Sequence, residues 1–288
     1  MRSRKPPARP FPSGRNRPSA QADTGDRPGP VPERERRGTR PLGQDRRPPA
    51  AGRREWIFGL HAVTAALDNG RREVLRVLAT RDSQRLVADI AKAKGCTVTV
   101  TDAAEIARLL PPQAVHQGLA AEAVPLPDLS LDEALDSAGP SALFVLLDQV
   151  TDPHNVGAIL RSAAAFDAAA VVMTERNAPP VTGIVAKTAS GALDRVPVVR
   201  VVNLAQTLER LAEEGFIRVG LAEETSDTLA SLRLNGRVAL VLGNEGDGLR
   251  RLTRIHCDRL ARLPTLPEFP SLNVSNAAAI ALYELRRR

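Results

Sequence analysis

Apolar runs alternate with amphipathic segments along most of the chain from Trp56 onward. A continuous apolar run at 142–148 is typical of a strand buried on both faces, and helical spacing of apolar positions follows at 156–167. The same alternation predicts further strands at 169–173, 196–202, 217–221, 238–242 and 260–263, and helices at 183–190, 204–214 and 274–286. Strands that alternate with helices indicate an α/β fold whose parallel sheet is covered by helices on both faces.

A smaller α/β unit precedes this pattern. It is predicted to contain helices at 58–67, 84–94 and 103–110 and strands at 74–79, 97–100 and 117–121. Prolines and a Gly-Pro pair then mark a linker around a helical stretch at 129–137. We therefore expect an arm at 1–54, a small α/β domain at 55–124, a linker at 125–140 and a larger α/β domain at 141–288.

The arm differs from the rest of the chain in composition. Of its 54 residues, 11 are Pro and 6 are Gly, so it cannot bury enough apolar surface to offset its ordering entropy and is expected to be disordered. The whole chain carries +7, but the arm carries +10 and residues 55–288 carry −3. The arm is therefore either a nucleic-acid-binding extension or a solubilising tail. Its prolines argue against the amphipathic helix of a transit peptide.

Several protein classes are excluded by pattern. No apolar run approaches 18 residues, so no membrane span is expected, and the N-terminus lacks the apolar region of a secretory signal. Cys96 and Cys257 are far apart and match no disulfide or metal spacing, which favours a reducing, cytoplasmic compartment. No Gly-x-Ser-x-Gly motif is present, and the four histidines are scattered.

Because ligands of parallel sheets bind at the carboxyl ends of the strands, the loops after 142–148, 238–242 and 260–263 are the candidate site. In the first, Asn155 precedes the helical pattern and is expected to cap the helix. Arg161 lies near the second turn, where it gains little from the helix dipole. It belongs either to a solvated face or to a functional site.

The second loop reads GNEGDG at 243–248, where glycines permit left-handed backbone and close approach of a ligand. It is not a phosphate-binding P-loop, and Glu245 suits either a helix N-terminus or a ligand that bears hydroxyl or amine groups. In the third loop, Ser271 or Asn273 is expected to cap the last helix. The other of these two polar groups is then available to a ligand.

Together, DPHNVGAILRSA (152–163), GNEGDG (243–248) and SLNVS (271–275) resemble the three motifs of the SPOUT superfamily, in its SpoU/TrmH branch of RNA ribose 2′-O-methyltransferases. The stretches between them look most like the 23S rRNA (guanosine-2′-O)-methyltransferase subgroup. Residues 56–121, with GLHAV and VHQG, resemble its small RNA-substrate-binding domain. The resemblance implies an α/β knot (a deep trefoil knot that forms the S-adenosylmethionine pocket), a homodimer, an RNA substrate and no metal.

The resemblance also assigns residues position by position. It implies an active site that is made of Asn155, Arg161, Glu245, Ser271 and Asn273. It implies methyl-donor contacts, much of them through backbone, at Leu242, Gly243, Leu263 and Leu272. The third loop departs from the family pattern at Thr265, Pro267 and Asn276, which puts Thr265 in doubt as a contact.

Methyl transfer from a sulfonium to a ribose hydroxyl needs orientation of the hydroxyl and stabilisation of the developing oxyanion. A guanidinium effectively never loses its proton, so Arg161 is expected to hold a phosphate and stabilise the oxyanion rather than act as a base. Asn155 would orient Arg161 or the ribose, and Glu245 would anchor the arginine or a ribose hydroxyl. Two alternatives stay open: a tRNA ribose 2′-O-methyltransferase, and a catalytically inactive RNA-binding protein associated with the ribosome.

Overall fold

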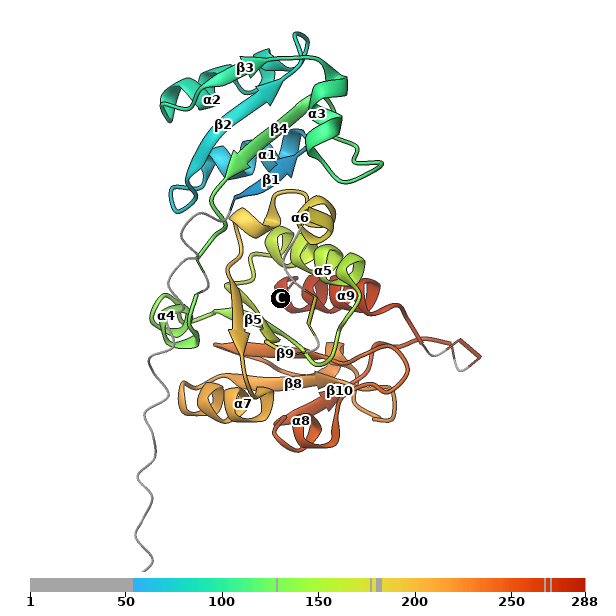
Figure 1. The fold of residues 1–288 in the computed structure, drawn as a ribbon. Helices are drawn as coiled ribbons and strands as arrows, with labels where there is room; N and C mark the ends of the chain where they lie inside the picture. The colour runs from blue at the N-terminus through green and yellow to red at the C-terminus, as the bar shows by residue number, and fades with distance from the viewer. Residues whose placement is uncertain are drawn as a thin grey trace, which may run out of the picture. The chain divides into compact units, whose positions relative to one another are not determined.

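The computed structural model describes residues 54–127, 129–176, 178–179, 183–266, 268–269 and 271–287. The predicted disordered arm, apart from Arg54, lies outside the described residues. The described chain is organised around two sheets, one of four strands and one of six (Figure 1).

The N-terminal sheet is mixed, with the strand order β1-β4-β2-β3. Strands β2 and β3 are parallel, whereas β4 runs antiparallel to both β1 and β2. Helices α1 and α2 supply apolar residues to one core, and α3 supplies Ile106 to a second core, so both faces of the sheet are covered. The strands are β1 (Glu55–Phe58), β2 (Val74–Ala79), β3 (Val98–Val100) and β4 (Leu119–Ala123), and the helices are α1 (Leu60–Asp68), α2 (Ala88–Ala93) and α3 (Ala103–Leu109).

Two sequence predictions for this part were wrong in detail. Phe58 was placed in the first helix but ends strand β1, because Gly59 adopts a φ of 89° and separates strand from helix. The helix predicted at 84–94 is broken into a 3₁₀ turn, η1 (Gln84–Leu86), and α2. The fully buried Val87 between them has non-helical backbone.

The C-terminal sheet has six strands in the order β10-β8-β9-β5-β6-β7, and every neighbouring pair is parallel. The predicted α/β fold with a parallel sheet is therefore confirmed. All residues of β5, β6 and β9 are buried, which is why these strands read as continuous apolar runs. The strands are β5 (Leu143–Leu147), β6 (Ala170–Thr174), β7 (Val198–Val201), β8 (Ile217–Leu221), β9 (Val238–Leu242) and β10 (Arg259–Ala261).

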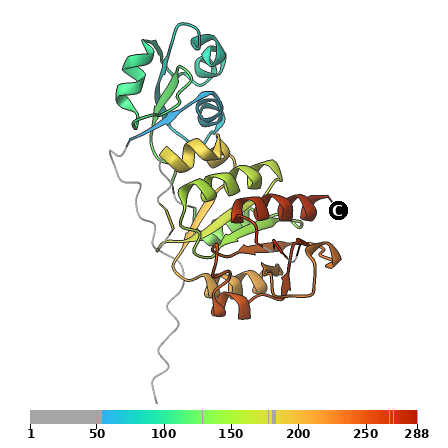
Figure 2. The same cartoon turned by 90° about the vertical axis from the view of Figure 1, so that its right-hand side faces the viewer.

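Helices cover both faces of this sheet (Figures 1 and 2). Alternate residues of β5 point to opposite faces: Val145 packs with α5 and α9, whereas Phe144 packs with α4 and α7. The helices are α4 (Leu131–Asp136), α5 (Pro153–Ala165), α6 (Gly183–Ala189), α7 (Leu204–Glu213), α8 (Arg251–Ile255) and α9 (Val274–Arg286), with 3₁₀ turns η2 (Ala192–Asp194) and η3 (Leu229–Ser231).

Arg72, in the loop before β2, ties the N-terminal sheet to the turn that follows α6. Its guanidinium forms an ion pair with Asp194, and the two side chains are only 3% and 4% exposed. Asn69 donates a second hydrogen bond to the same Asp194 oxygen at 3.0 Å, and Glu55 also pairs with Arg72. A buried pair of this kind fixes geometry, because removing one partner leaves an uncompensated charge.

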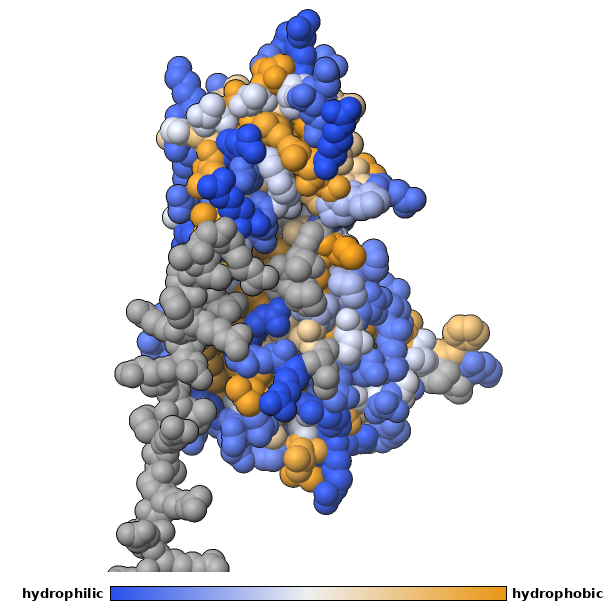
Figure 3. Space-filling view, in the orientation of Figure 1, coloured by the Kyte–Doolittle hydropathy of each residue, from blue (hydrophilic) through white to orange (hydrophobic). Residues whose placement is uncertain are grey.

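Most of the face in Figure 3 is hydrophilic, and hydrophobic residues reach it in separate groups. Within the described part of the chain, no helix combines the length and apolar character needed to cross a membrane.

Candidate functional site

The three loops singled out in the sequence meet through Glu245. Its Oε1 atom accepts hydrogen bonds from Asn155 Nδ2 at 3.0 Å, from Asn273 Nδ2 at 2.6 Å and from the Val274 backbone N–H at 3.1 Å. Asn273 Nδ2 also donates to Asn155 Oδ1 at 3.1 Å. One residue from each loop therefore forms a single polar cluster, which we call the Glu245 cluster (Asn155, Glu245 and Asn273).

Asn155 does not cap its helix, contrary to the sequence prediction. Helix α5 begins two residues earlier at Pro153, and the Asp152 side chain accepts the backbone N–H of His154 at 2.9 Å. Proline is well placed at the first helical position, where its missing N–H costs nothing, and aspartate is a good cap. The Asn155 amide is thereby free to reach Glu245.

Asn273 is the cap of the last helix, as one of the two predicted alternatives required. Its Oδ1 accepts the backbone N–H groups of Ser275 and Asn276 at 3.0 and 3.4 Å, while its Nδ2 serves the Glu245 cluster. Both ends of this amide are therefore used. Ser271 is exposed and has no hydrogen-bond partner among the described residues, so the structure does not bring it into the cluster.

The glycine loop folds back on itself. Asn244 and Gly248 exchange two backbone hydrogen bonds of 3.1 Å, and Gly246 and Gly248 have φ values of 100° and 65°. A Cβ atom on Gly243 would lie 2.2 Å from the Gly248 carbonyl carbon, so only glycine fits there. The loop needs these glycines for its own closure, and the turn holds Glu245 at its tip.

Sequence reasoning missed Asp148 as a supporting residue. This carboxylate is 0% exposed at the end of β5 and accepts hydrogen bonds from the Arg250 backbone N–H at 2.9 Å and from Arg250 Nε at 2.6 Å. It joins the first loop to the end of the glycine loop. The sequence signal was the position of Asp148 directly after an apolar run. A carboxylate that is buried at the end of such a strand needs a hydrogen-bond or charged partner.

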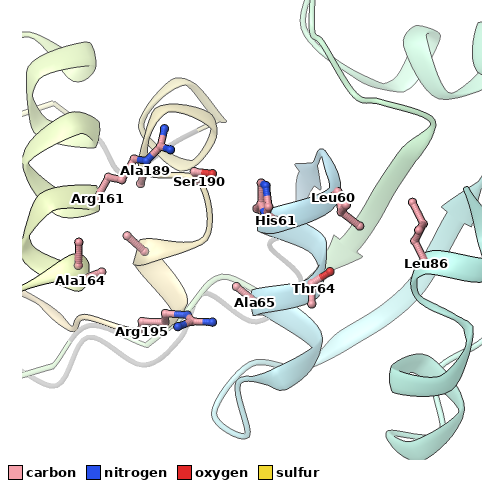
Figure 4. Close-up of a pocket in the computed structure, with 12 residues that line it drawn as sticks. Leu60, His61, Thr64, Ala65, Leu86, Arg161, Ala164, Ala189, Ser190 and Arg195 are labelled. Atoms are coloured by element: carbon pink, nitrogen blue, oxygen red, sulfur yellow. The ribbon is translucent and has the colours of Figure 1, made fainter. Parts of the chain in front are cut away.

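Arg161 does not join the Glu245 cluster within one chain. It lies six residues after Asn155 on α5, about 9 Å further along the helix axis and on a different face. Its exposed guanidinium lines a pocket of about 470 Å³ together with His61, Ser190 and Arg195 (Figure 4). Three of the five predicted active-site residues are thus brought together, and Arg161 and Ser271 are placed apart from them.

The predicted methyl-donor positions offer free backbone groups. Gly243, Leu263 and Leu272 are half-buried, and none of them forms a backbone hydrogen bond with another described residue. Leu242 is buried, and its carbonyl accepts the Asp148 N–H at 2.8 Å. Because partly buried backbone groups need partners, these groups are available to hydrogen-bond water or a ligand. No group of three or more potential metal ligands occurs among the described residues.

Two family models match this chain. Residues 142–283 match the SpoU rRNA Methylase family model, and residues 56–129 match the model for RNA 2′-O ribose methyltransferase substrate binding. The 23S rRNA (guanosine-2′-O-)-methyltransferase RlmB of Xylella fastidiosa strain Temecula1 is 44% identical over 249 residues, which cover 81% of this chain and 96% of the relative. The enzyme of the same name from Coxiella burnetii is 41% identical over 239 residues, with 81% and 95% covered.

Solved structures show the same fold. The SpoU methyltransferase AviRb from Streptomyces viridochromogenes, crystallised with AdoMet, superposes with a TM-score of 0.69 at 24% identity. The match covers 81% of this chain and 89% of that one.

Proposed function

Because this chain belongs to the SpoU rRNA methylase family, we propose that it transfers the methyl group of S-adenosylmethionine to a guanosine ribose 2′-hydroxyl in 23S rRNA. Relatives that carry this activity in their names match 81% of the chain at 40% identity or more. The observation that supports the proposal best is the Glu245 cluster, which unites the three motif loops at hydrogen-bond distances. The enzyme acts on RNA with a sulfonium methyl donor, and its place is the cytoplasm.

The proposed mechanism assigns orientation to the Glu245 cluster. S-adenosylmethionine, when bound, supplies a methyl group that is already activated for in-line displacement. Asn155 and Asn273 fix the loops around the reacting ribose, and Glu245 positions both asparagines, since its Oε1 is engaged by three donors. Arg161 holds a phosphate and stabilises the oxyanion that develops as the 2′-hydroxyl attacks, the methyl–sulfur bond breaks, and the hydroxyl proton leaves to solvent or a phosphate. Ser271 closes the third loop over the nucleoside.

The donor contacts are proposed at the free backbone groups of Gly243, Leu263 and Leu272, beside Leu242. We further propose that the chain is knotted around this pocket. The support is the family, since the resemblance of the three motifs to the SpoU/TrmH branch implies this knot. The domain limits that go with this proposal are 1–54, 55–124, 125–140 and 141–288.

A homodimer is part of the proposal. Arg161 and the Glu245 cluster lie on different faces of α5 in one chain. A second copy of the chain could therefore bring its Arg161 to the Glu245 cluster of the first. Apolar side chains are available for the contact: Ile280 and Tyr283 of α9 are 47% and 54% exposed. Light scattering coupled to size exclusion measures the oligomeric state, and Tyr283→Glu should shift a dimer toward monomer and reduce methyl transfer.

The direct test of function uses labelled S-adenosylmethionine and three RNA substrates from a strain that lacks the protein: 23S rRNA, ribosomal subunits and bulk tRNA. We expect incorporation into 23S rRNA alone or within subunits, and an Arg161→Ala variant slower by roughly 10²–10³ in kcat with unchanged donor affinity. Incorporation into tRNA alone would select the tRNA enzyme, and donor binding without transfer would select an inactive RNA-binding protein. Full activity of Arg161→Ala would refute the assignment of that residue.

The arm remains a proposal from the sequence. With a net charge of +10, residues 1–54 are proposed to bind RNA without sequence specificity. Deleting residues 1–53 should weaken RNA binding and its salt dependence while donor affinity stays constant. An unchanged salt slope would reduce the arm to a solubilising tail.

A further inference from the structure

The pocket beside Arg161 lies between helix α1 and the turn that follows α6 (Figure 4). Helix α1 contributes His61 and Thr64, and Ser190 and Arg195 line the opposite side with Arg161. Much of the remaining wall consists of small side chains, namely Ala164, Ala165, Ala189 and Ala192. The pocket therefore combines polar groups with small side chains, over which an extended ligand chain can approach the backbone closely.

The pocket is positively charged. Arg161 and Arg195 are both exposed, and neither has a carboxylate within 4 Å among the residues that the structure describes. Among the described residues, none that lines the pocket is acidic. The side chain of Asp194, the nearest acid in sequence, is only 4% exposed because it pairs with Arg72 and Asn69. The ion pair that joins the N-terminal sheet to this turn thus also removes a negative charge that would compete with an anionic ligand.

Close backbone packing holds the two sides of the pocket together. Gly191 has a φ of 87°, and a Cβ atom there would lie 2.7 Å from the Ala65 Cβ and 2.8 Å from the His61 carbonyl oxygen. The turn and α1 are consequently in direct contact, with no room for a side chain between them. Arg195 points toward α1 near Ala65 in Figure 4.

We propose that this pocket binds a phosphodiester of the substrate RNA adjacent to the methylated nucleotide, and that Arg195 is its anchoring residue. The inference rests on the proposed function, because it takes the ligand to be the strand on which Arg161 acts. A guanidinium pairs with phosphate oxygens through parallel hydrogen bonds, and two uncompensated guanidinium groups in one pocket match a phosphate chain. Because α1 belongs to the N-terminal sheet, the strand would contact both halves of the enzyme at this point.

The test compares Arg195→Ala with wild type on 23S rRNA transcribed in vitro. Losing one charge-assisted contact should raise the KM for RNA about tenfold and leave kcat within about twofold. The slope of log affinity against log salt should become shallower by about 0.7–0.9, as expected for one phosphate contact. S-adenosylmethionine affinity, measured by calorimetry without RNA, should not change. Arg195→Lys keeps the charge and should recover part of the affinity.

Arg233→Ala is the matched control. Arg233 is also exposed and has no carboxylate partner in the described part of the chain, but it lines a separate pocket beside Ile217 at the start of β8. Its loss should leave the KM for RNA and the salt slope near wild type. Thermal unfolding of every variant verifies folding, and Arg195→Gln replaces Arg195→Ala if the smaller side chain destabilises the turn.

The outcomes separate this inference from the proposed function. If wild type methylates the transcript and Arg195→Ala behaves like Arg233→Ala in KM and salt slope, the phosphate subsite is overturned and the function stands. If wild type transfers no methyl group, the function fails, and filter binding of the same transcript then decides the subsite. An Arg195→Ala variant with weaker S-adenosylmethionine binding and unchanged RNA affinity would also overturn the proposal, because the pocket would then serve the donor.

Discussion

Replacing Glu245 tests whether its carboxylate positions the site or takes part in chemistry. Glu245→Ala removes the acceptor of three hydrogen bonds, of 3.0, 2.6 and 3.1 Å. Because Glu245 is exposed and water replaces part of what is lost, each bond is worth about 0.5–1 kcal/mol rather than the larger values of buried charged bonds. The free energy of unfolding should therefore fall by about 1.5–3 kcal/mol.

Glu245→Gln keeps one oxygen that can accept the same donors but removes the charge. Neutral hydrogen bonds are roughly half as strong as charged ones, so the expected loss of unfolding free energy is about 1 kcal/mol. If Glu245 acts by position, the methyl-transfer rate of Glu245→Gln should stay within about tenfold of wild type. Glu245→Ala should lose about 10²-fold, the cost of misplacing groups by about 1 Å.

Urea unfolding and single-turnover methyl transfer measure the two effects on the same samples. Glu224 offers a matched control, because it is 72% exposed and pairs only with the half-exposed Arg254 among the described residues. Its replacement should change stability by less than about 0.5 kcal/mol. A purely positional role of Glu245 is refuted if Glu245→Gln unfolds almost like wild type and yet transfers methyl groups as slowly as Glu245→Ala, since the charge itself would then be needed.

Three further predictions concern groups outside the Glu245 cluster. Arg72→Met leaves Asp194 buried without its charged partner and should lower the free energy of unfolding in urea by about 3–5 kcal/mol. Adding Asp194→Asn should recover part of this loss. An unchanged urea midpoint for Arg72→Met would contradict the stabilising role of the ion pair. Burial raises the pKa of the Cys257 thiol to about 12. At pH 8 a thiol reagent should therefore label native Cys257→Ser, which retains Cys96, faster than native Cys96→Ser, which retains Cys257. Equal labelling rates would show that burial does not protect Cys257. A hydrogen bond to the Leu252 carbonyl, together with Glu209, raises the pKa of His256. The protonated imidazole therefore stabilises the fold fully below the ordinary pKa of about 6.5, and this contribution of less than about 1 kcal/mol is lost as the pH rises through the higher folded pKa. In urea unfolding at several pH values, His256→Gln should flatten this part of the stability profile.

The elements predicted best are those in which one local pattern decides the outcome. Strands β5 and β9 are buried along their whole length, so an uninterrupted apolar run identified them. Helix α8 was missed because it has five residues and exposes its large apolar positions, Leu252 by 59% and Ile255 by 61%, so no buried stripe marks it. Strand β1 was missed because its four residues run directly into α1 through a single glycine.

The candidate site was predictable only in part. Periodicity placed the three loops at the carboxyl edge of the sheet, and the motif resemblance selected Asn155, Glu245 and Asn273. Neither could show that one oxygen of Glu245 receives both amides, because this contact depends on how the three loops fold against one another. The cap at Asp152 was recognisable from the following proline, and overlooking it led to the wrong role for Asn155.

The contact between Asn155 and Asn273 also sets the earliest time during synthesis at which the Glu245 cluster can form. These residues are 118 positions apart in the chain, so the cluster cannot exist until the third loop has been synthesised. At about 5–20 residues per second, this interval lasts roughly 6–24 s after Asn155 is added. A nascent chain can thus complete most strands of its sheet before the Glu245 cluster is able to form, and the cluster forms only with the last helix.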